Sequence, residues 1–272
     1  MPSPTQITVP RLSRLVGTPD APVLIDVRID EDFKDDPRLI PSSFRCAHDA
    51  IASFAHRLHG KRTVVICQKG RKLSEGAAAI LRSHGVAAET LEGGQFAWRD
   101  AGEPLVPAEK LPPRNPEGQT VWVTRQRPKI DRIACPWLIR RFVDPHAQFL
   151  FVAPSEVIGV AEKFSATPFD IENVFWSHRD DKCTFDTMIE EFSLQSQALN
   201  HLAAIVRGAD TNRHDLAPEA KGLLAASLGL SRMFRDDLAQ LEAGMMLYDS
   251  FYRWARDATE EGHDWPSALN RS

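Results

Sequence analysis

The stretch TVVICQKGRKLS, from Thr63 to Ser74, decides the fold of the first half of the chain. It starts with an apolar, β-branched run at residues 64–66 that predicts a buried strand. Cys67 follows at once, and a helical pattern begins near Leu73. A strand, a short loop and a helix in this order are typical of a parallel α/β sheet, which binds ligands at the carboxyl ends of its strands. The sequence therefore predicts that Cys67 lies at a ligand-binding edge.

The loop after this strand surrounds the cysteine with positive charge. Its side chains supply cations, its backbone N–H groups can converge on one point, and the following helix adds the positive end of its dipole. Positive charge favours the thiolate, which is the nucleophilic form of cysteine. Cys67 could instead be a small buried apolar residue, but a core position needs no flanking cations, so we favour a catalytic nucleophile. The candidate substrate-binding residues are Gln68, Lys69, Gly70, Arg71 and Lys72.

This stretch resembles the active-site loop of rhodanese-type sulfurtransferases. The sequence LIDVR at residues 24–28 is similar to the early strand of that family, and LEGG at residues 91–94, followed by Trp98, is similar to its closing signature. The resemblance implies a parallel sheet with helices on both faces and a cysteine that carries sulfane sulfur as a persulfide, with no cofactor required. Many thiosulfate-using members end the loop with arginine, whereas Lys72 stands there in this chain. Lysine lacks the bidentate fork of arginine, so the donor stays open.

Asp26 and Arg28 end the first predicted core strand. Asp26 could be catalytic, but an Asp-x-Arg pair at a strand end is more often a hydrogen-bonded pair that fixes neighbouring loops. We therefore expect a structural role for both residues.

Length and composition indicate a soluble protein of two domains. The chain has 272 residues, of which 43% are hydrophobic and 26% charged, with a net charge of −4, and a domain is typically about 150 residues long. This balance offers no bulk attraction to nucleic acid or to anionic lipid, and we expect neither as a partner. The N-terminus shows no secretory signal or membrane span, which predicts a cytoplasmic protein.

The four cysteines, Cys46, Cys67, Cys135 and Cys183, have no CxxC spacing and are expected to be free thiols or ligands.

The proline content divides the chain. Residues 1–106 form the predicted rhodanese-like domain, residues 107–118 a semi-rigid proline-rich linker, and residues 119–272 a second domain. Apolar residues at three- and four-residue spacing predict that the second domain is mostly helical with a small sheet, an α+β arrangement. The predicted helices are residues 130–142, 155–164, 185–192, 197–206, 217–228 and 236–256, and short β runs are expected at 121–123, 149–152 and 174–176.

The second domain resembles the C-terminal domain of the ChrB chromate-resistance family, from about residue 121 to residue 254. The resemblance implies a role in chromate resistance beside a transporter in a bacterium. Members with a proposed regulatory role have a different N-terminal unit. The shared motifs are WVTR at 122–125, PKIDRIACPWLIRRF at 128–142, SHR at 177–179, CTFD at 183–186 and IVRGADT at 205–211.

These motifs place polar side chains at the ends of predicted elements. We expect His178, Cys183 and Asp210 to lie together and to bind either a metal ion or an oxyanion. Thiolate and imidazole ligands favour zinc or iron. Asp131 and Cys135 share one face of a helix start. The alternative is that acidic residues here cap helices, with arginines paired to them and Cys183 packed as a small apolar residue.

The favoured function is a cytoplasmic sulfurtransferase linked to chromate resistance, with a small anionic sulfur donor and a thiophilic acceptor. Chromate, sulfate and thiosulfate are all tetrahedral dianions, which makes the fusion chemically reasonable. One alternative is an oxyanion- or metal-sensing regulator with Cys67 as a redox-responsive thiol. The basic cluster at residues 125–129 is small and no helix-turn-helix pattern stands out, which disfavours DNA binding. Another alternative is a metal-dependent redox enzyme carried by the second domain. The oligomeric state does not follow from the sequence.

Overall fold

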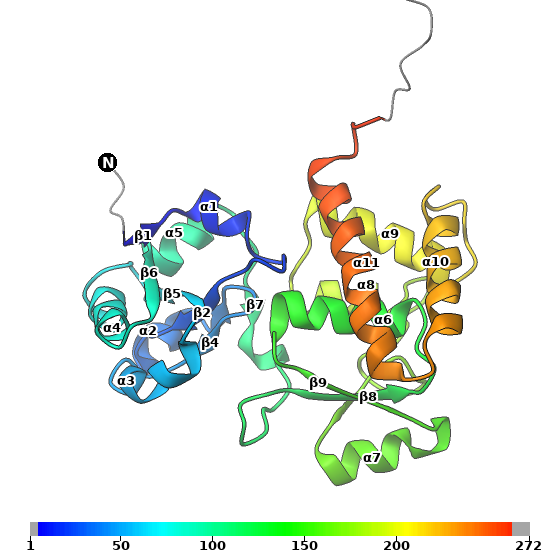
Figure 1. Cartoon of the computed structure of the whole chain (residues 1–272), viewed down its shortest axis with the longest axis horizontal. Coiled ribbons are helices and arrows are strands. Elements are labelled where there is room, and N and C mark those ends of the chain that lie inside the picture. The colour runs from blue at the N-terminus through cyan, green and yellow to red at the C-terminus, as the bar shows by residue number, and fades with distance from the viewer. Residues whose placement is uncertain (1–4, 263–272) are drawn as a thin grey trace, which may run out of the picture.

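A five-stranded parallel sheet forms the N-terminal lobe, with the strand order β1-β6-β5-β2-β4. The computed structural model describes residues 5–262, which form two lobes lying side by side (Figure 1). The central strand carries the apolar run that precedes Cys67, because a strand flanked on both sides and covered on both faces must be apolar throughout. The strands are β1 (Gln6–Ile7), β2 (Val23–Asp26), β4 (Phe44–Arg45), β5 (Arg62–Ile66) and β6 (Ala87–Leu91).

Helices cover both faces of this sheet, which confirms the predicted fold class. Along β5, Val64 and Ile66 pack with α1 (Val9–Ser13) and α5 (Gly94–Asp100). Val65 and Cys67 point to the opposite face, where they pack with α3 (Ile51–Phe54), a 3-10 turn (Ala55–Leu58) and α4 (Lys72–Ser83). This alternation follows from the two-residue period of a strand. The remaining helix of this lobe, α2 (Asp30–Asp35), follows β2.

The proline-rich segment begins inside the N-terminal lobe. Two short strands, β3 (Arg38–Leu39) and β7 (Val106–Pro107), pair antiparallel, and Val106 is buried. Pro107 is tolerated because the pair is only two residues long and offers an edge position. A 3-10 turn (Ala108–Lys110) follows, and Lys110 Nζ lies 2.6 Å from Glu191 of the other lobe. The expected linker is therefore anchored at its first residues.

The C-terminal lobe packs helices against a three-stranded parallel sheet of order β10-β8-β9, so the expectation of a helix-rich domain with a small sheet is confirmed. Its strands are β8 (Val121–Arg125), β9 (Gln148–Val152) and β10 (Thr167–Pro168). Its helices are α6 (Asp131–Leu138), which continues as a π-helix (Ile139–Val143), then α7 (Val157–Phe164), α8 (Thr184–Glu191), α9 (Gln197–Asp210), α10 (Ala220–Met233) and α11 (Asp237–Asp257).

The strand expected at residues 174–176 does not form. Trp176 makes only an isolated bridge to Phe169. Its ring instead stacks on Phe192, with 4.6 Å between ring centroids, and meets the edge of Trp122. Aromatic packing from three segments therefore determines this stretch, a non-local effect that the apolar run alone does not show.

The two lobes share one hydrophobic core. A single cluster of buried residues runs from β1 and α1 through α6, α8 and α9 to α11. The Ser42 N–H donates to the carbonyl of Phe142 at 2.6 Å, and Arg256 donates to the carbonyl of Arg14 at 3.2 Å. The lobes are therefore in direct contact as well as joined by the chain.

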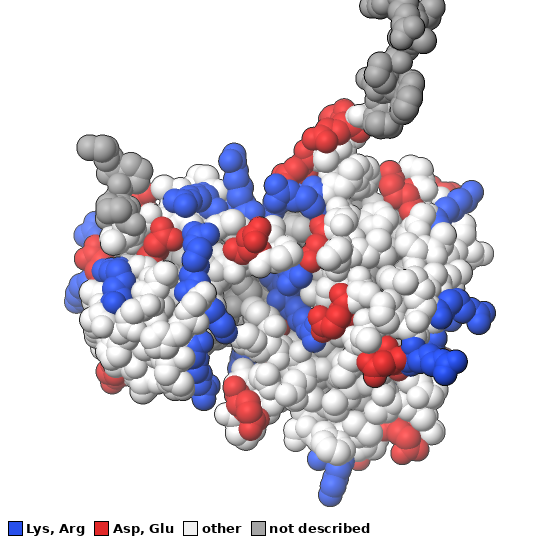
Figure 2. All heavy atoms as spheres, viewed as in Figure 1, with Lys and Arg blue, Asp and Glu red and all other residues white. Residues whose placement is uncertain are grey.

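Charges of both signs cover the visible surface. Figure 2 shows Lys and Arg side chains gathered at the edge of the N-terminal lobe beside the C-terminal lobe, with acidic side chains among them. Within residues 5–262, none of the helices combines the length and the apolar composition that crossing a membrane requires.

Candidate functional site

Cys67 lies directly after β5, between the sheet and the start of α4. Its Sγ atom accepts the N–H of Arg71 at 3.3 Å and lies 3.2 Å from the hydroxyl of Ser74. That hydroxyl is also 3.0 Å from the carbonyl of Arg71. The sulfur thus meets polar hydrogens on the side of the helix N-terminus, which is where a negative charge is best stabilised.

The loop between Cys67 and α4 depends on two glycines. Gly70 has φ +63°, and a Cβ atom there would lie 2.4 Å from the carbonyl oxygen of Leu91. Gly94 has φ +62°, and its Cβ would lie 2.2 Å from the carbonyl oxygen of Cys67. Only glycine fits both the left-handed backbone and this close approach. The start of α5 then binds the loop, because Gln95 N–H donates to the carbonyl of Cys67 at 3.0 Å.

The other residues expected to bind substrate follow Cys67 in the loop and the first position of α4. The side chains of Lys69, Arg71 and Lys72 are exposed, and the ion pairs found within residues 5–262 do not involve them. Gln68 is half-buried. Ser74 was not among the expected site residues, although its place in the first turn of the predicted helix put it within reach of the loop.

Asp26 and Arg28 form a buried structural pair, as the Asp-x-Arg pattern indicates. The Arg28 Nε atom donates to Asp26 at 2.8 Å. Its guanidinium also donates to the carbonyls of Asp36 and Arg38, at 2.9 and 2.8 Å. Arg28 therefore fixes the segment after β2, and its donors are already used within the fold.

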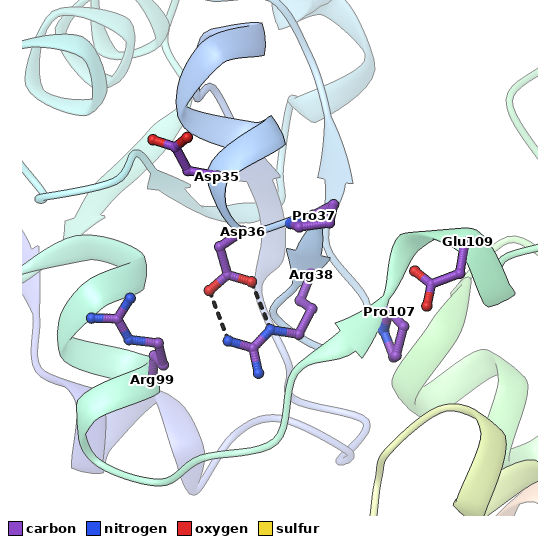
Figure 3. Close-up of a pocket in the computed structure, with 7 residues that line it drawn as sticks. All are labelled: Asp35, Asp36, Pro37, Arg38, Arg99, Pro107 and Glu109. Carbon is purple, nitrogen blue, oxygen red and sulfur yellow. Dashed lines mark hydrogen bonds and ion pairs between the residues drawn. The ribbon is translucent and has the colours of Figure 1, made fainter.

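A cavity of about 470 Å³ lies near that segment, at the junction of α2, β3 and β7 (Figure 3). Arg38 spans it with two hydrogen bonds to Asp36, at 2.6 and 2.9 Å. The hydrogen bond from Arg38 holds the pKa of Asp36 below its usual value. Its lining is of mixed charge and includes no residue of the Cys67 loop, so we assign it no part in the chemistry.

A second group of polar side chains gathers in the C-terminal lobe around His178. The Nε2 atom of His178 lies 3.4 Å from a carboxylate oxygen of each of three residues, Asp131, Asp170 and Asp210. Asp131 begins α6, Asp170 follows β10, and Asp210 ends α9. Ligand atoms of Asp131, Asp170 and His178 all lie within 4.8 Å of one another.

Neighbouring groups hold two of these carboxylates in place. The N–H groups of Thr184 and Phe185, at the start of α8, donate to Asp131 at 2.7 and 3.3 Å. The Thr184 hydroxyl donates to Asp170 at 2.9 Å, and Arg132 Nε lies 3.3 Å from the same carboxylate. These contacts therefore fix the orientation of the Asp131 and Asp170 carboxylates.

Burial and charge shift the pKa values in this group. The carboxylates, Asp131 foremost, raise the pKa of His178 to about 12. Burial raises the pKa of Asp131 to about 7. His178 is consequently a cation that partly offsets the surrounding carboxylates.

Comparison with known proteins agrees with this division into two lobes. The profile of the rhodanese-like domain matches residues 8–101. The profile described as "ChrB, C-terminal domain" matches residues 122–255. The chain joins a rhodanese-like domain to a ChrB C-terminal domain.

Individual relatives match parts of the chain. Protein ChrB of Cupriavidus metallidurans is 30% identical over 201 residues, which cover 67% of this chain and 59% of that protein. A Rhodopseudomonas palustris protein of unknown function, described as a possible tyrosine phosphatase, is 28% identical over 37% of this chain and 83% of its own, with a TM-score of 0.34. A rhodanese-like domain protein of Staphylococcus aureus is 26% identical over 35% of this chain and 90% of its own, with a TM-score of 0.31.

In the ChrB C-terminal domain the structure changes the expected set of ligands. His178 and Asp210 lie together, but the Cys183 thiol donates to Asp186 at 3.2 Å in a capping box at the start of α8. Burial raises the pKa of Cys183 well above its usual value and so keeps it a thiol. Arg207 pairs with Asp186 at 2.9 Å. For Cys183 and Asp186 the helix-cap alternative therefore describes the structure, because the thiol is used by its own helix.

Asp131 and Asp170 take the place of that thiol beside His178. The sequence had indicated Asp131 only as the neighbour of Cys135 on a helix face, and Cys135 is fully buried. Asp170 gave no signal, because it reaches the group through the pairing of β10 with β8.

Proposed function

We propose that the rhodanese-like domain is a sulfurtransferase that carries sulfane sulfur on Cys67 as a persulfide. The observation that carries this proposal is the placement of the Arg71 N–H and the Ser74 hydroxyl, at 3.3 and 3.2 Å from Sγ. Donors to sulfur favour the thiolate and the persulfide anion over the neutral thiol. The comparisons support a rhodanese-like domain. The two groups next to Sγ in this chain support persulfide formation on Cys67.

The transfer takes two displacement steps. The Cys67 thiolate attacks the sulfane sulfur of a donor such as thiosulfate, a new S–S bond forms, and the donor's own S–S bond breaks, so that sulfite leaves with the electron pair. An acceptor thiolate then attacks the outer sulfur, and Cys67 leaves as thiolate. No external oxidant or reductant is needed. Cys67 acts as nucleophile and then as leaving group.

The exposed cations of the loop recruit the donor. Lys69, Arg71 and Lys72 follow Cys67 within five residues and have exposed side chains, so an anion that approaches the loop meets their combined field. A chromate-resistance role for the fused protein is part of this proposal, since the ChrB C-terminal domain accompanies the sulfurtransferase domain in one chain.

Mass spectrometry of the full chain after mixing with thiosulfate tests the proposal. We expect the mass of one sulfur atom on the peptide that contains Cys67, and its complete loss in Cys67→Ser. Cys46→Ser is the matched control, because Cys46 is a half-buried thiol of the same domain outside the loop. Added sulfur on Cys46 with Cys67 unmodified contradicts the proposal. Persulfide formation without transfer to any thiol acceptor would favour the sensor alternative.

A further inference from the structure

We propose that the ChrB C-terminal domain binds one divalent manganese or iron ion between Asp131, Asp170 and His178, with Asp210 beside His178. The site is separate from Cys67 and does not depend on the proposed sulfur transfer. Its residues come from α6, from the segment after β10, from the segment before α8 and from the end of α9.

The geometry around His178 is unsuited to hydrogen bonding alone. Nε2 carries at most one hydrogen, yet three carboxylate oxygens lie at the same distance of 3.4 Å from it. Charge-assisted N–H···O bonds are about 2.7–2.9 Å long, so none of the three is a good one. Donor atoms about 2.1 Å from one ion lie about 3.0–4.2 Å apart. Each carboxylate oxygen lies within that range of Nε2, and ligand atoms of Asp131, Asp170 and His178 lie within 4.8 Å of one another.

The balance of charge also favours a cation. Three carboxylates surround one imidazole, and within residues 5–262 the arginine ion pairs with this group are made to Asp170, by Arg132 at 3.3 Å and Arg125 at 3.5 Å. Asp131 and Asp170 are nearly inaccessible to solvent, at 1% and 6% exposure. Carboxylates removed from water need a compensating charge, and a divalent ion supplies more of it than a singly charged imidazole.

A buried hydroxyl supplies a second observation. Thr124 is fully buried, and its Oγ1 atom has no hydrogen-bond partner within the described residues. Strand alternation puts Thr124 on the same face of β8 as Trp122, whose ring packs on Phe169 and Trp176. Phe169 precedes Asp170, and Trp176 lies two residues before His178. Thr124 therefore lies on the face of β8 that packs against the segment from Phe169 to Trp176, between Asp170 and His178 at its ends, and its buried hydroxyl is a polar group that the described residues leave unsatisfied.

The donor atoms select the class of ion. Carboxylates suit manganese and magnesium, and imidazole suits iron and its neighbours, so a site with both and without thiolate favours Mn²⁺ or Fe²⁺. The preference for Mn²⁺ or Fe²⁺ differs from the zinc or iron expected from the sequence, because that expectation counted the Cys183 thiol as a ligand. His178 and Asp210 are 42% and 21% exposed, which leaves a path by which the ion and its water can enter from solvent.

The test uses the full chain, stripped with EDTA and titrated with MnCl₂ while the electron paramagnetic resonance signal of free Mn²⁺ is followed. We expect one Mn²⁺ per chain, a higher melting temperature with the ion, and no displacement by a large excess of MgCl₂. Asp210→Asn and His178→Ala should each weaken Mn²⁺ binding by at least the roughly 10- to 100-fold caused by outer-shell changes.

His201→Ala is the matched control, because His201 is a half-buried histidine of the same domain that packs on Trp254. It should bind Mn²⁺ like the wild type. Asp210→Asn keeps the test valid if His178→Ala does not fold, since Asp210 is partly exposed at the end of α9, lies beside His178, and is replaced by a side chain of the same shape. Absence of Mn²⁺ binding, wild-type affinity for Mn²⁺ in both site variants, or displacement of Mn²⁺ by MgCl₂ would overturn the proposal.

Discussion

The Cys67 sulfur lies where a strand ends and a helix begins, and each neighbouring group acts on it separately. The Arg71 N–H is fixed by the backbone, whereas the Ser74 hydroxyl can turn either to the sulfur or to the Arg71 carbonyl. The serine can therefore donate to a thiolate or persulfide and accept from a thiol. This makes Ser74 a residue whose removal should affect the sulfur without altering the loop.

Ser74→Ala should slow persulfide formation from thiosulfate by about 10- to 100-fold, because a hydrogen bond to a charged group contributes about 1.5–3 kcal/mol. Single-turnover kinetics of the purified chain measure the effect. Ser83→Ala is the control, since Ser83 lies on the same helix, is exposed and donates to the carbonyl of Ile80. Equal rates for Ser74→Ala and the wild type would remove Ser74 from the site.

Lys72→Ala should raise the thiosulfate concentration needed for half-maximal rate by a few-fold, and Lys72→Arg should preserve or improve it. The residue is exposed, so its attraction for an anion is screened and should fade as salt is added. Lys61→Ala, which removes an exposed lysine just before β5, should leave the rate unchanged. An unchanged concentration dependence in Lys72→Ala means that the donor binds elsewhere.

At the scale of elements, the loop after β5 is held by its contacts with α5. Gly70 lies against Leu91 and Gly94, and the start of α5 donates to the carbonyls of Cys67 and Gln68. The LEGG sequence is thus the partner surface of the Cys67 loop. Gly94 meets the backbone of Cys67 and Gly70 so closely that no room is left for a side chain.

Gly70→Ala should lower the free energy of unfolding by at least about 1–2 kcal/mol, the cost of a left-handed residue with a Cβ, and should abolish persulfide formation. Urea denaturation measures the first effect and mass spectrometry the second. Gly76→Ala is the matched control on α4, where a Cβ meets nothing within 4 Å. It should stabilise the chain by about 0.5–1 kcal/mol. A fully active Gly70→Ala would show that the loop tolerates another shape.

Features built from residues that are neighbours in the sequence could be predicted, and features that join distant segments were harder to predict. The Cys67 loop could be predicted because strand, loop and helix start are contiguous, and the six helices of the second domain followed from their apolar spacing. Around His178 the neighbouring Asp210 was expected from motifs at the ends of predicted elements, whereas Asp131 and Asp170 join the group from two further elements that the sequence alone does not bring together. Cys183 and Asp186 were ambiguous for a physical reason: a side chain at a helix start can either cap that helix or face a ligand.

At the scale of the whole molecule, an ion pair connects the proline-rich segment to the C-terminal lobe. Glu191 on α8 lies 2.6 Å from Lys110 and also pairs with Arg179. The hydrogen bond from Lys110 holds the pKa of Glu191 below its usual value. Since the folded state lowers this pKa, the stabilisation is present above pH about 4.5 and is lost as the pH falls further.

Glu191→Gln should therefore destabilise the chain at neutral pH, by below about 1 kcal/mol for a pair this close to solvent, and match the wild type near pH 3. Thermal melts across that pH range measure the difference. Glu190→Gln, which removes the exposed pair with Lys182 on the same helix, is the control for charge alone. A difference that grows on acidification would contradict the assignment.

The contact between Gly17 and Phe142 restricts which domains could be exchanged for one another. Gly17 has φ +79°, and a Cβ there would lie 2.2 Å from the ring of Phe142, which the π-helix presents to the N-terminal lobe. A rhodanese domain grafted from another protein would need a residue without a side chain at this point and a free N–H where Ser42 meets the Phe142 carbonyl. The two domains are thus complementary in shape where they meet, although they match separate families. A chimera that folds must therefore carry the contacting surfaces of both domains from the same protein.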